Sequence, residues 1–156
     1  MMGMPEHRLY FAYGSNMGQS VLRKERCPRA VQVGVAKIAD HRLGFTRYSK
    51  KRGGGVADLV PAPGSVVWGA IFDLAHDGFE ALDRAEGVRF DAYRRERRTV
   101  LRADGAALSV WTYIVVHKEP ELPPSRMYWK LLVDGAREAG LPPRYVQTLE
   151  ALTFAT

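Results

Sequence analysis

The chain has 156 residues, of which 46% are hydrophobic and 26% are charged, and its formal net charge is +6. This length and balance are typical of one ordinary globular domain, and they exclude the fibrous and disordered classes of protein. We therefore expect residues 1–156 to form a single domain. The basic charge favours anionic partners, either small substrates or a polyanion, without choosing between them.

The sequence contains no run of about 20 apolar residues, the length needed to span a bilayer, and its start lacks the apolar centre of a secretory signal. Cys27 is the single cysteine, which excludes an internal disulfide and a cysteine-clustered zinc site. The four histidines are far apart and none has the spacing of a metal-ligand pair. We therefore expect a cytoplasmic protein with no metal site and no membrane partner.

The first half of the chain has the pattern of strands with one short helix. In order, we expect a strand over residues 8–13, a helix over 18–26, a long or broken strand over 30–47, and strands over 56–60 and 66–74. Gly14, Ser15 and Asn16 end the first strand in a tight turn. Residues 61–64 (Pro-Ala-Pro-Gly) predict a turn between the last two strands. Residues 50–55, three basic residues and three glycines, predict a mobile, solvated loop.

The second half adds a hairpin and three helices. In order, we expect a helix over residues 77–85, strands over 97–102 and 108–116, a helix running from a Ser125 cap to residue 139, and a helix over 143–152. Asp104 and Gly105 favour a hairpin between the two strands. The elements together predict an α+β domain whose mostly antiparallel sheet is strongly curved or closed and carries helices on one side.

The turn formed by Tyr13, Gly14, Ser15 and Asn16 is the first candidate site. Gly14 permits backbone angles that a side chain would forbid, and successive N–H groups before a helix start can bind a carboxylate or an oxyanion. The alternative, from the residues alone, is a plain strand-to-helix connection capped by Ser15 or Asn16.

Glu86 is the second candidate, because it stands at the end of the helix expected over 77–85, directly before Gly87. A carboxylate in the last turn faces the negative end of the helix dipole, which should raise its pKa and make it a stronger base. The carboxylate of Asp83, one turn earlier, would repel the Glu86 carboxylate if both were ionised and close, and so raise the pKa of Glu86 further. The alternative is that Glu86 is an exposed acid at a helix end.

The basic runs at residues 50–52 and 94–98 leave a second class of function open. Because side chains alternate along a strand, Arg95 and Arg97 would share one face and the other two arginines of the second run the opposite face. A solvated edge strand guarded by charge explains this pattern. The alternative function is a binding or regulatory module that contacts nucleic acid or another polyanion through its basic clusters.

Several segments resemble, in order and spacing, those of the γ-glutamylcyclotransferase family within the AIG2-like superfamily. They are residues 9–17 (Leu-Tyr-Phe-Ala-Tyr-Gly-Ser-Asn-Met), 55–61, 67–74, 82–87 (Leu-Asp-Arg-Ala-Glu-Gly), 124–128 and 135–142. The resemblance covers nearly the whole chain. It implies the family fold, a single domain with a small, barrel-like mixed sheet, mostly antiparallel, and flanking short helices.

The resemblance also implies an activity: conversion of a γ-glutamyl amino acid or γ-glutamyl amine to 5-oxoproline and the free amino acid or amine, without a cofactor or metal. It assigns Glu86 as the general acid/base. The implied substrate-binding residues are Tyr10, Phe11, Ala12, Tyr13, Gly14, Ser15, Asn16, Tyr113 and Tyr128. The implied partner is a small γ-glutamyl molecule rather than nucleic acid, bound by a monomer or homodimer. The particular γ-glutamyl compound stays open.

Overall fold

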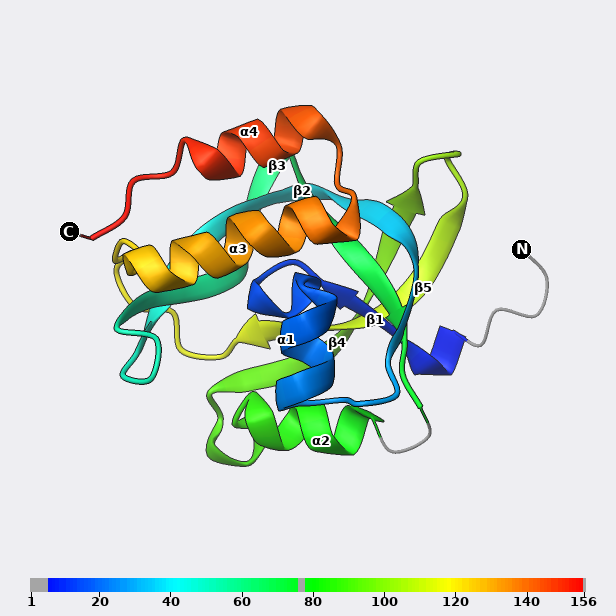
Figure 1. Ribbon diagram of the computed structural model, residues 1–156, viewed down its shortest axis with the longest axis horizontal. Coiled ribbons are helices and arrows are strands. Elements are labelled where there is room, and N and C mark those ends of the chain that lie inside the picture. Colours follow the sequence, from blue (N-terminus) through cyan, green and yellow to red (C-terminus); the bar gives the residue numbers. More distant parts are fainter. Residues whose placement is uncertain (1–5, 76–77, 156) are drawn as a thin grey trace.

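A closed barrel of strands forms the centre of the computed structural model, which describes residues 6–75 and 78–155 (Figure 1). Around the barrel the order is β1 (Leu9–Ala12), β3 (Gly54–Asp73), β2 (Val31–Ser49), β4 (Tyr93–Arg102) and β5 (Ala107–Val115). β1 and β5 close the barrel with a parallel pairing, and the other neighbours are antiparallel. The prediction of a barrel-like, mostly antiparallel mixed sheet is confirmed.

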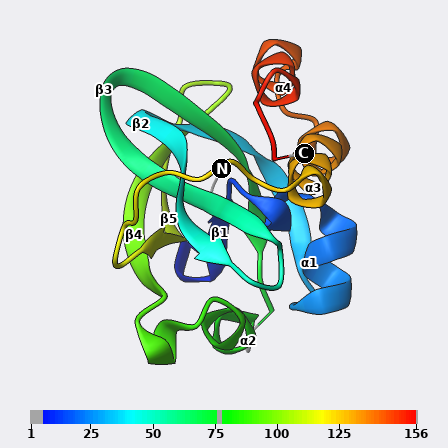
Figure 2. The ribbon, with the colours of Figure 1, turned by 90° about the vertical axis from the view of Figure 1, so that its left-hand side faces the viewer.

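Short helices flank this barrel. They are α1 (Gln19–Glu25), α2 (Gly78–Ala85), α3 (Arg126–Ala139) and α4 (Pro143–Glu150), with 3-10 turns η1 (Glu6–Arg8), η2 (Ser15–Met17) and η3 (Val88–Phe90). Figure 2 shows α1, α3 and α4 along one side of the barrel and α2 below it. The predicted helices are confirmed to within about two residues, although Asp77 lies outside the described residues. No helix in the described part of the chain is long and apolar enough to cross a membrane.

β2 and β3 form one long antiparallel ribbon, so the prediction of two separate strands over 56–60 and 66–74 is wrong. The Pro-Ala-Pro-Gly segment is an irregularity within β3, where the register with β2 shifts. Opposite it, Asp40 adopts a φ of 61° and accepts a hydrogen bond from the Gly64 N–H over 2.9 Å. Pro61 and Pro63 are exposed there, where a missing N–H costs no interior ladder bond.

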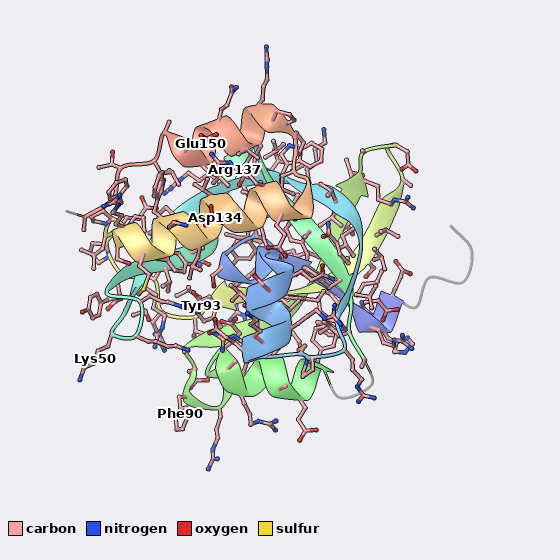
Figure 3. The ribbon with its side chains drawn as sticks, viewed as in Figure 1. Lys50, Phe90, Tyr93, Asp134, Arg137 and Glu150 are labelled. Atoms are coloured by element: carbon pink, nitrogen blue, oxygen red, sulfur yellow. The ribbon has the colours of Figure 1, made fainter. Side chains whose placement is uncertain are left out.

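The glycines of residues 53–55 do not form a mobile loop, which corrects the prediction for this segment. Gly54 and Gly55 are buried and begin β3. A Cβ on Gly54 would lie 2.7 Å from the backbone nitrogen of Ser125, and the Gly55 N–H donates to Pro123 O over 3.1 Å. The connection before α3 thus approaches β3 so closely that a side chain would not fit. Lys50 does point away from the barrel (Figure 3).

α3 packs against the segment that follows β1, and this contact brings distant parts of the chain to one place. The Ser125 side chain accepts a hydrogen bond from the Tyr128 N–H over 3.1 Å, so the predicted helix cap is confirmed. Further along α3, a Cβ on Gly135 would lie 2.8 Å from the Gly18 nitrogen. The later part of α3 is therefore held against the end of η2, while the Tyr128 hydroxyl, near the start of α3, lies beside Gly14 of the first candidate turn.

Candidate active site

A pocket of about 370 Å³ lies where four segments meet. They are the turn after β1, the loop between β2 and β3, the end of α2 and the start of α3. The strands β4 and β5 add Tyr93 and Tyr113 to its wall, and Figure 3 labels Tyr93 within the fold. The pocket thus gathers residues from both halves of the chain.

Glu86 enters this pocket from the end of α2. Its N–H donates to Leu82 O over 2.8 Å, and Leu82 is fully buried, which anchors the last helical turn. Gly87 then adopts a φ of 65° and turns the chain away. The Glu86 side chain lines the pocket, is partly buried, and accepts a hydrogen bond at Oε1 from Asn16 Nδ2 over 3.2 Å. Glu86 is therefore not the exposed helix-end acid of the alternative interpretation.

Burial raises the pKa of Glu86 above its ordinary value of 4.5, because desolvation penalises the charged form. Arg26, the Asn16 amide and Arg52 act in the opposite direction and limit the rise. The pKa of Glu86 is therefore raised, as expected, but the main cause is desolvation and not the helix dipole. Asp83, expected to add like-charge pressure, is engaged elsewhere, 3.3 Å from Arg95 in an ion pair.

The candidate turn has a different geometry from the one expected. Gly14 has a φ of −112°, so a positive φ is not the reason for a glycine. Space is the reason, because a Cβ there would lie 3.2 Å from Ala57 Cβ and 3.3 Å from the Tyr128 hydroxyl oxygen. Neither Ser15 nor Asn16 caps η2 or α1 through its side chain. The alternative of a plain capped connection is therefore not observed.

Asn16 connects the turn to Glu86. Its side chain is 5% exposed, and Nδ2 donates to the Tyr10 hydroxyl over 3.1 Å as well as to Glu86. Its Oδ1 is buried and has no hydrogen-bond partner within residues 6–75 and 78–155. The amide therefore fixes the carboxylate while keeping one acceptor unused.

The Tyr128 hydroxyl accepts a hydrogen bond from the Ala57 N–H over 3.1 Å. It also lies beside the candidate turn, because a Cβ on Gly14 would be 3.3 Å from its oxygen. A phenol has one proton to donate, and Tyr128 lines the pocket. Tyr128 can therefore present its O–H to a bound molecule beside the turn that was expected to face an oxyanion.

The pocket tyrosines are not bases at neutral pH. Burial raises the pKa of Tyr128 to about 12 and raises the pKa of Tyr10, Tyr13, Tyr93 and Tyr113 as well. The Tyr13 hydroxyl donates to Tyr113 O over 2.5 Å and the Tyr93 hydroxyl to Ala57 O over 2.9 Å. These phenols hold their protons and act through hydrogen bonds.

Positive charge surrounds the pocket. Its lining includes Arg26, Arg47, Lys50, Lys51 and Arg52, and among the described lining residues Glu86 is the one carboxylate. Such a lining attracts anionic ligands. The Arg52 side chain is 12% exposed, whereas that of Lys51 is 68% exposed, and both lie within 3.5 Å of Glu25 Oε1.

Comparison with known proteins places this geometry in a family. The AIG2-like family model matches residues 66–149. The chain is 34% identical to mouse (Mus musculus) γ-glutamylcyclotransferase over 148 residues, which are 92% of this chain and 78% of the mouse protein. The chain belongs to the γ-glutamylcyclotransferase family. The human (Homo sapiens) γ-glutamylcyclotransferase is 33% identical over 151 residues, covering 94% and 79% of the two chains.

A solved structure of a γ-glutamyl cyclotransferase agrees with this assignment to the family. Its TM-score to this chain is 0.90 at 31% identity, over 94% of this chain and 88% of the other. The resemblance drawn from the sequence motifs is therefore confirmed, and so is the γ-glutamylcyclotransferase-like fold.

The structure brings most of the expected site residues to this pocket. Its lining contains Tyr10, Tyr13, Gly14, Ser15, Asn16, Glu86, Tyr113 and Tyr128. Phe11 and Ala12, also expected as substrate contacts, are not part of the lining. Both are fully buried in β1, where the backbone pairs with β3, so they support the pocket from the core.

Arg26 and Tyr93 are among the lining residues that sequence reasoning missed. Arg26 follows α1 and faces Glu86 electrostatically, although nothing in its local pattern distinguishes it from the other arginines. Tyr93 opens β4 just before the basic run, and its register opposite Val115 is visible only in the folded sheet.

Proposed function

We propose that this protein is a γ-glutamylcyclotransferase that converts a γ-glutamyl amino acid or γ-glutamyl amine to 5-oxoproline and the free amino acid or amine. The observation that carries the proposal is the Glu86 carboxylate, desolvated and held by Asn16 in a cationic, tyrosine-lined pocket. Membership of the family supports the same chemistry.

The substrate contains its own nucleophile, since its α-amine can reach the γ-carbonyl carbon and close a five-membered ring. Glu86 takes a proton from the α-ammonium group, and the freed nitrogen attacks the γ-carbonyl. After the attack the ring nitrogen carries one surplus proton. As the amide C–N bond breaks, Glu86 gives its first proton to the departing nitrogen and takes the surplus proton from the ring nitrogen, and this second proton leaves with the amine product in its ammonium form. Holding the two groups in reacting geometry supplies much of the acceleration.

The raised pKa of Glu86 suits this double duty. A group that first accepts and later returns a proton works best when its pKa lies near the operating pH. Desolvation raises the pKa of the carboxyl group, while Arg26 and Arg52 lower it. One carboxyl group can therefore serve both steps, and the proposed reaction needs no cofactor.

Tyr128 is the proposed donor to the oxyanion that develops on the γ-carbonyl oxygen. The Ala57 N–H donates to its oxygen, and its own proton remains available for the ligand. A positioned donor of this kind is commonly worth about 3 kcal/mol of transition-state stabilisation. Gly14 keeps the space beside this hydroxyl open.

The alternative of a polyanion-binding module is not favoured, because the run at residues 94–98 is engaged within the fold. Glu96 forms ion pairs with both Arg94 and Arg98. The guanidinium groups of Arg95 and Arg97 lie over the Trp111 ring, at 4.8 and 4.6 Å from its centre. The predicted alternation of the four arginines along the strand is confirmed.

We further propose that residues 1–156 act as a single cytoplasmic domain, as a monomer or homodimer that binds no nucleic acid.

The experiment that tests the proposed activity incubates the purified protein with γ-glutamyl amino acids, γ-glutamyl amines and glutathione, and measures release of 5-oxoproline. We expect the strongest turnover with γ-glutamyl amino acids, whose extra carboxylate suits the cationic lining. No release from any member of the panel would overturn the proposed activity.

A further inference from the structure

Tyr113 is tied to an ion pair that lies outside the pocket lining. Its hydroxyl donates to Asp83 Oδ1 over 2.6 Å, and Arg95 Nε lies 3.3 Å from the same oxygen. Asp83 is on α2, one turn before Glu86, while Arg95 and Tyr113 face each other across β4 and β5. The helix that ends just before Glu86 therefore carries one member of this ion pair, Asp83.

Arg95 is held in place by two aromatic rings. Its guanidinium carbon lies 4.7 Å from the centre of the Phe79 ring and 4.8 Å from that of the Trp111 ring. The two rings themselves meet edge to face at 6.5 Å. Cation–π contacts on both sides restrict the guanidinium group, so the position of Asp83 is fixed as well.

The direction of the Tyr113 hydrogen bond determines what the phenol offers to a ligand. The carboxylate of Asp83 in this ion pair accepts hydrogen bonds and donates none. The single phenol proton is therefore committed to Asp83, and the Tyr113 oxygen presents only lone pairs to the pocket. Tyr128 differs, because its oxygen accepts a hydrogen bond from the Ala57 N–H and its proton remains available to the ligand.

Tyr113 and Glu86 line the same pocket. The Tyr10 ring packs against the Tyr113 ring at 5.8 Å, and the Tyr10 hydroxyl shares the Asn16 amide with Glu86. A substrate ammonium group that gives one N–H to Glu86 has others to give to a neighbouring acceptor. The substrate's α-amine is the part of a γ-glutamyl compound that fits an acceptor here.

We infer that Asp83, fixed by Arg95, is a positioning residue for Tyr113. Asp83 accepts the hydrogen bond from the Tyr113 hydroxyl, so the Tyr113 oxygen is left as a hydrogen-bond acceptor for the substrate's α-amine. The inference rests on the proposed cyclotransferase function. It assigns opposite ends of the substrate to the two phenols, with the amine at Tyr113 and the γ-carbonyl oxygen at Tyr128.

The test compares Asp83→Ala, Asp83→Asn, Tyr113→Phe and the double variant Asp83→Ala/Tyr113→Phe with γ-glutamyl-alanine as substrate. Asp83→Ala and Tyr113→Phe should each lower kcat/KM about tenfold, the effect of one lost hydrogen bond to a charged group. Asp83→Asn should keep most of the activity, because the amide oxygen can still accept the hydrogen bond from the Tyr113 hydroxyl. Adding Asp83→Ala to Tyr113→Phe should change kcat/KM by less than about twofold.

A second probe separates positioning from structural damage. Glutaryl-alanine is the same compound without the α-amine, so it cannot cyclise and offers no N–H to Tyr113. The inhibition constant of glutaryl-alanine should change by less than about twofold in Asp83→Ala. A distorted pocket would instead weaken the binding of glutaryl-alanine as much as it weakens the binding of the substrate. Asp134→Asn, an exposed α3 carboxylate in ion pairs with Lys130 and Arg137, is the matched control and should behave as wild type.

Two results would overturn the inference while leaving the cyclotransferase function intact. The first is an active wild type in which the effects of Asp83→Ala and Tyr113→Phe simply add in the double variant. The second is an equal loss of glutaryl-alanine binding in Asp83→Ala. A wild type that releases no 5-oxoproline would instead overturn the proposed function, and the inference with it.

Discussion

The side-chain amide of Asn16 lies between Glu86 and Tyr10, with Nδ2 3.2 Å from Glu86 Oε1 and 3.1 Å from the Tyr10 hydroxyl oxygen. Seventy residues of sequence separate Asn16 from the carboxylate it orients. The amide also lowers the pKa of Glu86 against the larger effect of burial. Its Oδ1 is buried without a hydrogen-bond partner among the described residues.

Replacing Asn16 with Ala should lower kcat by about 10- to 100-fold, because Glu86 loses the group that fixes its direction. The measurement is steady-state release of 5-oxoproline. Gln147→Ala removes an exposed amide on α4 and is the matched control, expected to be unaffected. An Asn16→Ala enzyme as active as the control would show that Glu86 needs no orientation by this amide.

Arg26 should influence the pH dependence of the reaction. Glu86 must be ionised to take a proton, so kcat/KM falls as pH drops through the pKa of Glu86. Arg26 lowers that pKa, and removing its charge should raise it. In Arg26→Gln the acid limb of the profile should therefore move to higher pH, and the loss of activity should shrink as pH rises.

The control for this shift is Lys24→Gln, which removes one positive charge from the exposed face of α1. Its acid limb should coincide with that of the wild type at moderate ionic strength, since distant surface charges are screened. If the acid limb of the pH profile were the same for Arg26→Gln and the wild type, Arg26 would have no influence on the ionisation of Glu86.

A methyl group at Gly14 should damage the site. The Cβ of Gly14→Ala would press on Ala57 and on the Tyr128 hydroxyl, at 3.2 and 3.3 Å. We expect kcat/KM to fall about tenfold or more, with a loss of about 1–3 kcal/mol in the free energy of unfolding. Gly34→Ala is the control, because nothing lies within 4 Å of a Cβ there. Equal effects of the two changes, measured by activity and denaturant unfolding, would contradict the close packing at Gly14.

The mouth of the pocket should favour anionic substrates. Lys51 is 68% exposed and lies 3.5 Å from Glu25, so its charge stays in contact with solvent. Lys51→Gln should lower kcat/KM for a γ-glutamyl amino acid about two- to threefold at low salt and less at high salt. Lys130→Gln, which removes a 72% exposed lysine paired with Asp134, should have no effect. A loss that does not depend on salt would point to a contact other than long-range attraction.

The sequence predicts those parts of the molecule whose cause is local. Ser125 begins α3 because its hydroxyl caps the helix, and Gly140, with a φ of 78°, follows its end. The Asp104-Gly105 pair turns the chain between β4 and β5, where Gly105 adopts a φ of 87°. The residues themselves indicate the turn at Asn16 and the acid at Glu86 as candidates, and the resemblance to the family assigns their roles.

The failures have tertiary causes. Pro-Ala-Pro-Gly at residues 61–64 has the composition of a turn, but the paired length of β2 carries β3 through it. Gly54 has the composition of a flexible loop, yet the segment before Ser125 packs against it. Arg26 faces Glu86 only because α1 and the end of α2 meet, a relationship that no short window of sequence contains.

The central claim is that Glu86 performs the proton transfers. The most direct measurement compares wild type and Glu86→Gln for release of 5-oxoproline from γ-glutamyl-alanine, with thermal unfolding of both to show that the variant is folded. Because glutamine keeps the shape and cannot take up a proton, a folded Glu86→Gln should be at least about 100-fold slower. A folded Glu86→Gln with activity within a few-fold of the wild type would contradict the account.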